Sequence, residues 1–134
     1  MFILLNAACS GKVNNVYVET LAKSTVSWDG ENLPAYHQGQ PEVTILRIKI
    51  PAGAKLEMHR HPAINAGVLL NGELTVITDN NKILHLKAGD SIVEVVDKWH
   101  YGKNEGNKTA EIIVFYAGVV DEPITVKRDY GTPK

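Results

Sequence analysis

Short apolar runs with the two-residue periodicity of β-strands recur about every eight to twelve residues through the middle of the chain. They lie at residues 43–50, 68–70, 73–77, 82–86, 91–96 and 109–116. Glycine, asparagine and proline separate the runs, and no segment has a helical apolar stripe with capping residues. The pattern predicts an all-β fold, a small antiparallel β-barrel or jelly roll, rather than alternating helices and strands.

Three of these runs carry sharper signals. In 43–50, the even-numbered residues from Thr44 to Ile50 alternate with a second set that ends in Arg47 and Lys49, as in a strand with one buried face. The runs at 68–70 and 73–77 flank Asn71-Gly72, which favours a type I′ turn because both central positions of that turn have positive φ. This pair predicts a tight hairpin of two adjacent strands.

Length and charge exclude several classes of protein. A chain of 134 residues is expected to form one domain. The net charge of −1 and the absence of a basic cluster argue against a nucleic-acid partner. No apolar run approaches the roughly 20 residues of a transmembrane helix, so no membrane span is expected.

The chain has a single cysteine, Cys9, near its N-terminus. Residues 5–9 resemble the end of a bacterial lipoprotein signal, although the basic region and most of the apolar region of such a signal are absent. As written, the chain is expected in the cytoplasm with Cys9 as a buried thiol. If the true start lies upstream, a periplasmic protein with a lipid anchor at Cys9 is the alternative.

Three of the five histidines occupy positions where they could bind a metal. His59 and His61 are two residues apart, so in an extended segment both imidazoles project from the same face. His100 begins a later run, and an antiparallel barrel can bring its ring to the inner face opposite the first pair. Three neutral imidazoles suit Fe, Zn, Ni, Mn or Cu and leave coordination positions open. The alternative is a surface or packed histidine pair.

The spacing around these histidines resembles the two sequence motifs of the cupin family. The first motif is Gly, five residues, His-x-His, three or four residues, Glu, six residues, Gly; its positions are filled here by Gly53, His59, His61, Asn65 and Gly72. The second is Gly, five residues, Pro-x-Gly, two residues, His, three residues, Asn; its positions are filled by Gly89, Val95, Asp97, His100 and Asn104.

The resemblance covers about residues 43–117 and implies a compact single-domain cupin. It divides the chain into an N-terminal segment with a strand and a rim loop (1–42), the barrel core (43–117), and a C-terminal strand and tail (118–134). It implies one divalent metal at His59, His61 and His100, and it also suggests a homodimer.

Asn65 stands where the family's metal-binding glutamate is expected. With Asn65, the site resembles that of the three-histidine cupins, which include thiol dioxygenases and diketone-cleaving enzymes. Held by three neutral rings, a divalent ion keeps its full +2 charge and favours an anionic or chelating ligand. In such a site Asn65 is expected to be a fourth ligand or a group that orients the ligand. The alternative is that Asn65 marks weakened or lost metal binding.

Carboxylates near the motifs are candidates for acid–base chemistry. Glu57 shares a face with His59 and His61 in a regular strand, so it could be a general acid or base or a substitute ligand, or else a solvated rim residue. Glu94 and Glu111 lie within apolar runs and are expected to point outward.

Two classes of function fit this sequence. The first is a metal-dependent enzyme of dioxygenase, isomerase or lyase type that acts on a small anionic or oxygenated molecule. The second is a non-catalytic cupin that binds or senses a small ligand, with weak or no metal. Fold alone does not choose between them.

Overall fold

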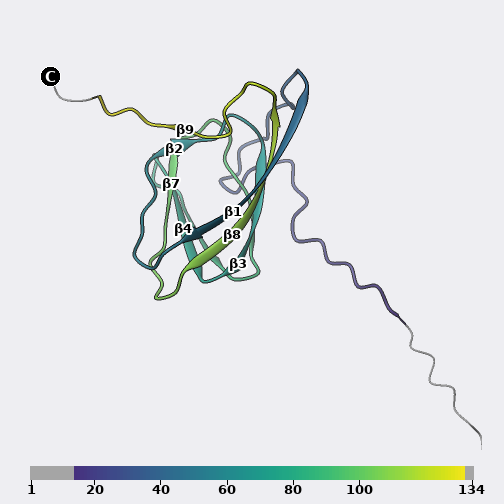
Figure 1. Cartoon of the computed structure of the whole chain (residues 1–134), viewed down its shortest axis with the longest axis vertical. Helices are drawn as coiled ribbons and strands as arrows, with labels where there is room; N and C mark the ends of the chain where they lie inside the picture. The colour runs from purple at the N-terminus through teal and green to yellow at the C-terminus, as the bar shows by residue number, and fades with distance from the viewer. Residues whose placement is uncertain (1–13, 132–134) are drawn as a thin grey trace, which may run out of the picture.

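The computed structural model describes residues 14–131, and all regular secondary structure within them is β-strand (Figure 1). The strands are β1 (Pro41–Ile50), β2 (His59–Arg60), β3 (Asn65–Asn71), β4 (Glu73–Thr78), β5 (Ile83–Lys87), β6 (Ser91–Val93), β7 (His100–Lys103), β8 (Ala110–Val119) and β9 (Val126–Lys127). The predicted all-β class is confirmed.

The strands form two antiparallel sheets that face each other around a common interior (Figure 1). One sheet has the order β1-β8-β3-β6, and the other has the order β5-β4-β7-β2-β9. Neighbours in a sheet are mostly distant in sequence, as in a jelly roll, so residues from both halves of the chain meet inside. The strand expected in the C-terminal tail is β9, which pairs with β2.

The alternation of residues 43–50 gives the strand one buried face, as expected. From Thr44 to Ile50 of β1, the even-numbered side chains face the interior and the odd-numbered ones are exposed. β1 pairs along its whole length with β8, where Ile112, Val114 and Tyr116 are buried and point to the same side. These two strands supply much of one wall of the interior.

The predicted hairpin at Asn71-Gly72 is wrong. β3 pairs with β8 and β6, whereas β4 pairs with β5 and β7, so this turn carries the chain from one sheet to the other. Of the two residues Asn71 and Gly72, only Gly72 has a positive φ, at 74°. A Cβ on Gly72 would lie 2.8 Å from the carbonyl oxygen of Thr109. Glycine is needed here because the crossing passes close to a neighbouring backbone, not because a type I′ turn requires it.

The segment 14–40 contains no strand, which agrees with the long loop expected before residue 43. Its later part lies along β6: the hydroxyl of Ser91 donates a hydrogen bond to the carbonyl of Leu21, and the amide of Trp28 donates to the carbonyl of Val93. Cys9, the expected thiol or lipid attachment point, lies outside the described residues. Within residues 14–131, no helix exists that is long and apolar enough to span a membrane.

Candidate metal centre

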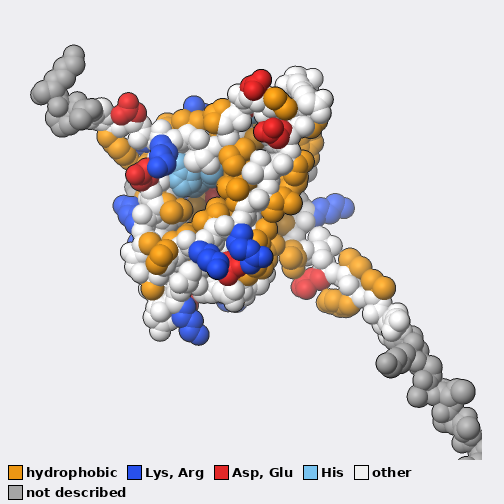
Figure 2. Space-filling view, viewed as in Figure 1, with side chains coloured by type: hydrophobic (Ala, Val, Ile, Leu, Met, Phe, Trp, Pro, Cys, Tyr) orange, Lys and Arg blue, Asp and Glu red, His pale blue; other side chains and the backbone are white. Residues whose placement is uncertain are grey.

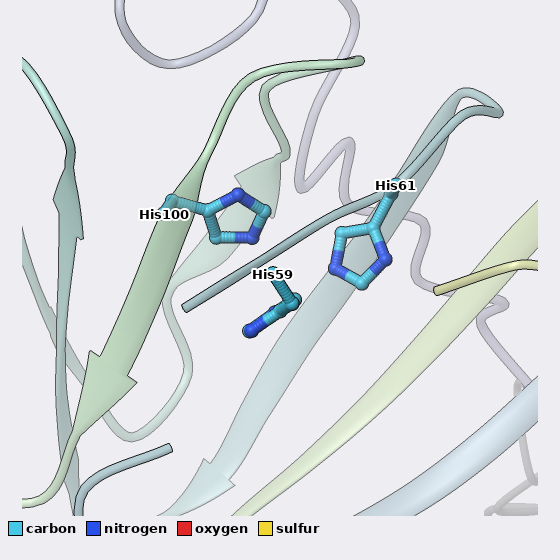
Figure 3. Close-up of side chains that lie close together, drawn as sticks. All are labelled: His59, His61 and His100. Carbon is cyan, nitrogen blue, oxygen red and sulfur yellow. The ribbon is translucent and has the colours of Figure 1, made fainter. Parts of the chain in front are cut away.

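His59, His61 and His100 come together at one end of the barrel interior (Figure 3). One ring nitrogen from each lies within 4.8 Å of those of the other two, and the ring centroids are 4.5 to 5.0 Å apart. His100 does not lie across the barrel as the sequence suggested. It is the cross-strand neighbour of His59 in the same sheet, since β2 pairs with β7.

Each imidazole is oriented by a backbone carbonyl. The Nδ1 atom of His59 lies 2.7 Å from the carbonyl oxygen of Glu57, that of His61 lies 2.8 Å from the carbonyl of Ile124, and that of His100 lies 2.9 Å from the carbonyl of Lys98. A carbonyl only accepts hydrogen bonds, so each Nδ1 carries the proton. The lone pair is then on Nε2 in all three rings, which is the tautomer that a metal ligand needs.

Burial keeps two of these rings neutral. Loss of solvation lowers the pKa of His61 to about 3, and the hydrogen bond that His61 donates to the carbonyl of Ile124 only partly opposes this. The same cause lowers the pKa of His100 to about 4. Both imidazoles are therefore uncharged at neutral pH, with a proton on Nδ1 and a lone pair on Nε2 available for a cation.

Glu94 is part of the site, and the expectation that it points outward is wrong. The residue is 8% exposed, and its Oε2 lies 3.6 Å from Nε2 of His100. Its Oε1 accepts hydrogen bonds from the indole Nε1–H of Trp28 at 2.7 Å and from the amide of Val95 at 2.9 Å. Burial raises the pKa of Glu94 to about 7, although these hydrogen bonds oppose the rise.

A signal for this orientation existed in the sequence. Ile92 and Glu94 are two residues apart, and a strand that buries Ile92 places Glu94 on the same face. The expectation that Glu94 points outward follows instead from the general preference of carboxylates for solvent. The indole of Trp28, which holds the carboxylate inside, comes from a loop 66 residues away in sequence.

Asn65 also faces the interior and is 2% exposed. Its side-chain amide donates to the carbonyl of Ala63 at 3.2 Å. Opposite it in register is Tyr116, whose ring centroid is 5.4 Å from that of His61. Burial raises the pKa of Tyr116 to about 12, so its hydroxyl stays protonated and can donate a hydrogen bond.

The C-terminal segment completes this end of the site. The carbonyl of Ile124 orients His61, and the hydroxyl of Thr125 lies 3.2 Å from the same Nδ1. Thr125 is also hydrogen-bonded to Tyr116. These partners could not be named from the sequence, because they depend on where the tail crosses the barrel.

Glu57 lies at the rim of the same cavity, with its side chain 71% exposed. It forms an ion pair of 2.9 Å with Lys127, and this pairing lowers its pKa. Glu57 therefore shares the cavity with His59 and His61, but its carboxylate is solvated and neutralised by a lysine. Glu111 is on the outer side of β8, paired with Arg47, as expected.

The three histidines open onto a cavity of about 470 Å³ inside the barrel. Figure 2 shows histidine side chains in a hollow on one face of the molecule, with charged side chains beside them on one side and hydrophobic side chains along part of the rim. This volume is within the range of small-molecule sites, about 300 to 1,000 Å³.

The donor set suits a transition metal ion. One ring nitrogen of each histidine lies within 4.8 Å of the other two, each Nδ1 is hydrogen-bonded to a backbone carbonyl, and a carboxylate and a cavity adjoin the rings. Zn²⁺ and related ions bind imidazole at about 2.0 to 2.1 Å and accept three protein ligands with open positions. His59, His61 and His100 could therefore hold one such ion, with room for a ligand beside it.

Similarity to solved structures supports the same fold. The chain is similar to oxalate oxidase in complex with the substrate analogue glycolate (27% identity, TM-score 0.54, covering 63% of this chain and 45% of that one). It is also similar to DMSP lyase DddQ from Ruegeria pomeroyi (20% identity, TM-score 0.56, covering 63% and 42%) and to a cupin-like protein from Thermotoga maritima (14% identity, TM-score 0.55, covering 64% of each).

The match to each of these proteins spans less than two thirds of its length, and for the two enzymes less than half. No curated protein matches the chain. The model of the cupin domain matches residues 46–116, a little more than half of the sequence, and this region contains all three clustered histidines. The two-sheet barrel and the matched domain together establish that the chain belongs to the cupin family.

Proposed function

We propose that the protein binds one divalent transition metal ion (Fe, Zn, Ni, Mn or Cu) through Nε2 of His59, His61 and His100. Beside that ion, the protein binds a small molecule that carries an anionic or oxygenated group. As an enzyme, it converts this molecule to a product. The reaction would be of the dioxygenase, isomerase or lyase type.

The observation that carries this proposal is the orientation of the three rings. Each Nδ1–H is directed to a backbone carbonyl, so the Nε2 lone pairs of three clustered rings are left available, and His61 and His100 are buried. Without a shared cation, this would concentrate three acceptors with no donor between them. The similar structures named for oxalate oxidase and DMSP lyase support a metal-assisted reaction of a small acid, although their own substrates are not transferred to this chain.

A bound ion supplies a Lewis acid that attracts an anionic oxygen of the ligand. The chain's own groups then act around that oxygen. Tyr116 donates a hydrogen bond to it. Asn65 either binds the metal through its amide oxygen as a fourth ligand or donates a hydrogen bond to the ligand through its amide N–H. Glu94 Oε2 is the buried carboxylate oxygen placed to exchange a proton with a molecule at this end of the cavity.

Glu57 remains a second candidate for acid–base chemistry. Its position at the cavity rim supports contact with an entering ligand, while its exposure and its pairing with Lys127 favour a role at the entrance. A homodimer also remains a prediction, supported by the exposed apolar side chains of Val43, Ile45 and Phe115 on the outer face of the β1–β8 pair.

A non-catalytic ligand-binding role is the alternative. The observation that favours it is Asn65, which brings no negative charge to the place where the family has a metal-binding glutamate. In this case the same cavity holds a ligand without converting it, and metal binding is weak.

The test is metal analysis of freshly purified protein followed by screening for turnover. About one transition metal ion per chain is expected, and small acids, diketones and thiols are then screened for oxygen uptake or product formation. Conversion of any of them supports the enzyme. Ligand binding without conversion supports the alternative, and a protein that takes up no metal when titrated with Fe²⁺, Zn²⁺, Ni²⁺, Mn²⁺ or Cu²⁺ contradicts the metal site.

A further inference from the structure

The interior changes from polar to apolar along the strands that form it. In β8 the successive inward residues are Tyr116, Val114 and Ile112. In β6, which pairs with β3, Ile92 faces inward, and the next inward residue is Glu94, just after the end of the strand. In both segments the polar residue, Tyr116 or Glu94, lies at the end of the cavity that holds the three clustered histidines, here called the histidine end. The next inward residue along each segment is aliphatic. The buried polar groups of these two segments thus lie at one end of the cavity. Lys55 also lines the cavity, but it is exposed and its amine lies 4.2 Å from the ring centroid of Tyr101.

The remaining walls of the cavity are aliphatic in both sheets. Leu46, Ile48 and Ile50 of β1 line it, with Leu46 in register with Val114 and Ile48 with Ile112. From the other sheet, Leu74 and Val76 of β4 line the opposite wall. Away from the histidines, a ligand would therefore contact hydrocarbon on both sides.

One inward position of β7 leaves space instead of filling it. After His100, the next inward residue is Gly102, which lines the cavity. A Cβ there would meet the terminal methyl groups of Leu56 and Leu74 at 3.4 Å. Even a single added methyl group would narrow the cavity at this point.

An open apolar volume of this size has a physical consequence. Protein interiors are normally packed as densely as organic crystals, and apolar cavities hold water poorly while binding apolar molecules readily. Burial of hydrocarbon in such a space is favourable in proportion to the area removed from water. A cavity of about 470 Å³ with aliphatic walls therefore gains most from a ligand that has a hydrocarbon part.

We propose that the ligand is an amphiphilic acid, with an anionic oxygen group at the histidine end and an apolar chain or ring in the aliphatic part of the barrel. This inference deepens the proposed function and rests on it for the position of the anionic group. The anionic end faces the metal, Tyr116 and Asn65. The hydrocarbon end lies between β1 and β8 on one side and β4 on the other.

A small and wholly polar acid such as oxalate fits these walls poorly. Oxalate would occupy only the histidine end and leave the aliphatic side chains in contact with trapped water. A second carboxylate directed at them would lose its hydration without a hydrogen-bond partner. The similar structures named for oxalate and glycolate are therefore poor guides to the ligand of this chain.

The test is a series of straight-chain carboxylates. Binding of acetate, butanoate, hexanoate, octanoate and oxalate to the zinc-loaded protein is measured by calorimetry. Affinity should rise by up to about fourfold for each added methylene group, until the cavity is full, and octanoate should bind more tightly than oxalate. Equal affinity for acetate and octanoate would overturn the proposal.

A matched pair of variants locates the binding. Ile112 points into the cavity, whereas its neighbour Ile113 lies on the outer side of β8. Ile112→Phe fills the cavity and should weaken octanoate binding at least about tenfold, while acetate binding and zinc content are retained; Ile113→Phe should leave all three unchanged. Equal octanoate affinity in the two variants would place the binding elsewhere. The carboxylate series uses the unaltered protein, so it decides the question even if Ile112→Phe does not fold.

Failure of the metal site and failure of the apolar site give different results. If the chain binds no metal, neutral octanol should still bind more tightly than butanol and compete with a fluorescent apolar probe. This would contradict the proposed function and support the apolar site. If zinc binds but chain length has no effect on acids or alcohols, the metal site stands and the amphiphilic ligand is wrong.

Discussion

The barrel core and the segments that flank it contribute differently to the candidate site. The region 46–116, which matches the family, supplies His59, His61 and His100 as well as Glu94. The flanking segments supply no clustered histidine within the described residues. They supply the partners of those groups: Trp28 holds Glu94, and the carbonyl of Ile124 orients His61.

This difference separates two properties of a metal site. The core determines which atoms are available as ligands, and the flanks determine how two of the groups are held and how far solvent is excluded. Partners behind the ligands typically change metal affinity or activity by about 10 to 100-fold. Proteins with the same core and other flanks can therefore differ in reactivity and ligand choice, although they share three histidines.

The largest effect is expected from a change in the core. His100→Ala removes one of three ligands and should weaken zinc affinity by more than about a hundredfold, beyond the range for outer partners. His85→Ala is the control, because His85 is exposed and lies outside the cluster. Competition with a chelator measures both. Unchanged affinity in His100→Ala would remove this residue from the site and break the distinction between core and flanks.

A second prediction concerns the metal-free protein. His61 and His100 have pKa values of about 3 and 4 when folded, against 6.5 for an unperturbed histidine, so the unfolded chain binds more protons as pH falls below 6.5. Glu94, raised to about 7, acts in the opposite direction: its contribution to stability is lost as pH rises from 4.5 through 7.

The destabilising contribution of the two histidines at low pH is larger than the stabilising contribution of the one carboxylate. The free energy of unfolding should therefore decrease by roughly 2 to 3 kcal/mol from pH 6.5 to pH 4. Urea denaturation in the presence of a chelator measures it. Glu94→Gln removes the opposing contribution and should steepen the decrease. Constant stability over this range would mean that the core histidines are not buried as a unit.

The smallest effect is expected from a flank. Trp28→Phe removes the indole donor to Glu94 and should lower the free energy of unfolding by about 1 to 2 kcal/mol. Trp99→Phe is the matched control: the ring of Trp99 lies between the side chains of Arg60 and Arg128, not against Glu94. A double-mutant cycle with Glu94→Gln isolates the pair. A coupling energy near zero would show that the flank does not hold the carboxylate.

Much of the core could be predicted from the sequence because the relevant signals are local. Two-residue alternation in 43–50 defines which side of β1 faces inward, and His-x-His spacing places His59 and His61 on one face. The motif spacing added His100, and the structure brings its ring nitrogen within 4.8 Å of the other two. The long loop before β1 and the short strand in the tail were also predictable from composition.

The errors concern pairing between distant residues. Asn71-Gly72 indicates a turn correctly, but a turn signal does not specify whether the next strand stays in the same sheet. The sequence predicts an exposed Glu94 because the cost of burying a carboxylate is large unless a partner is present, and its partner Trp28 comes from a loop distant in sequence.

The sequence by itself determined the β class, the inward faces of the strands and the identity of the clustered histidines, since alternation and motif spacing depend on neighbouring residues. Only the tertiary structure decided which strands pair, which carboxylate is buried, and that the cavity is polar at one end and aliphatic elsewhere. These features depend on contacts between segments distant in sequence, and their free energies are set by burial and by partners that meet only in the folded chain.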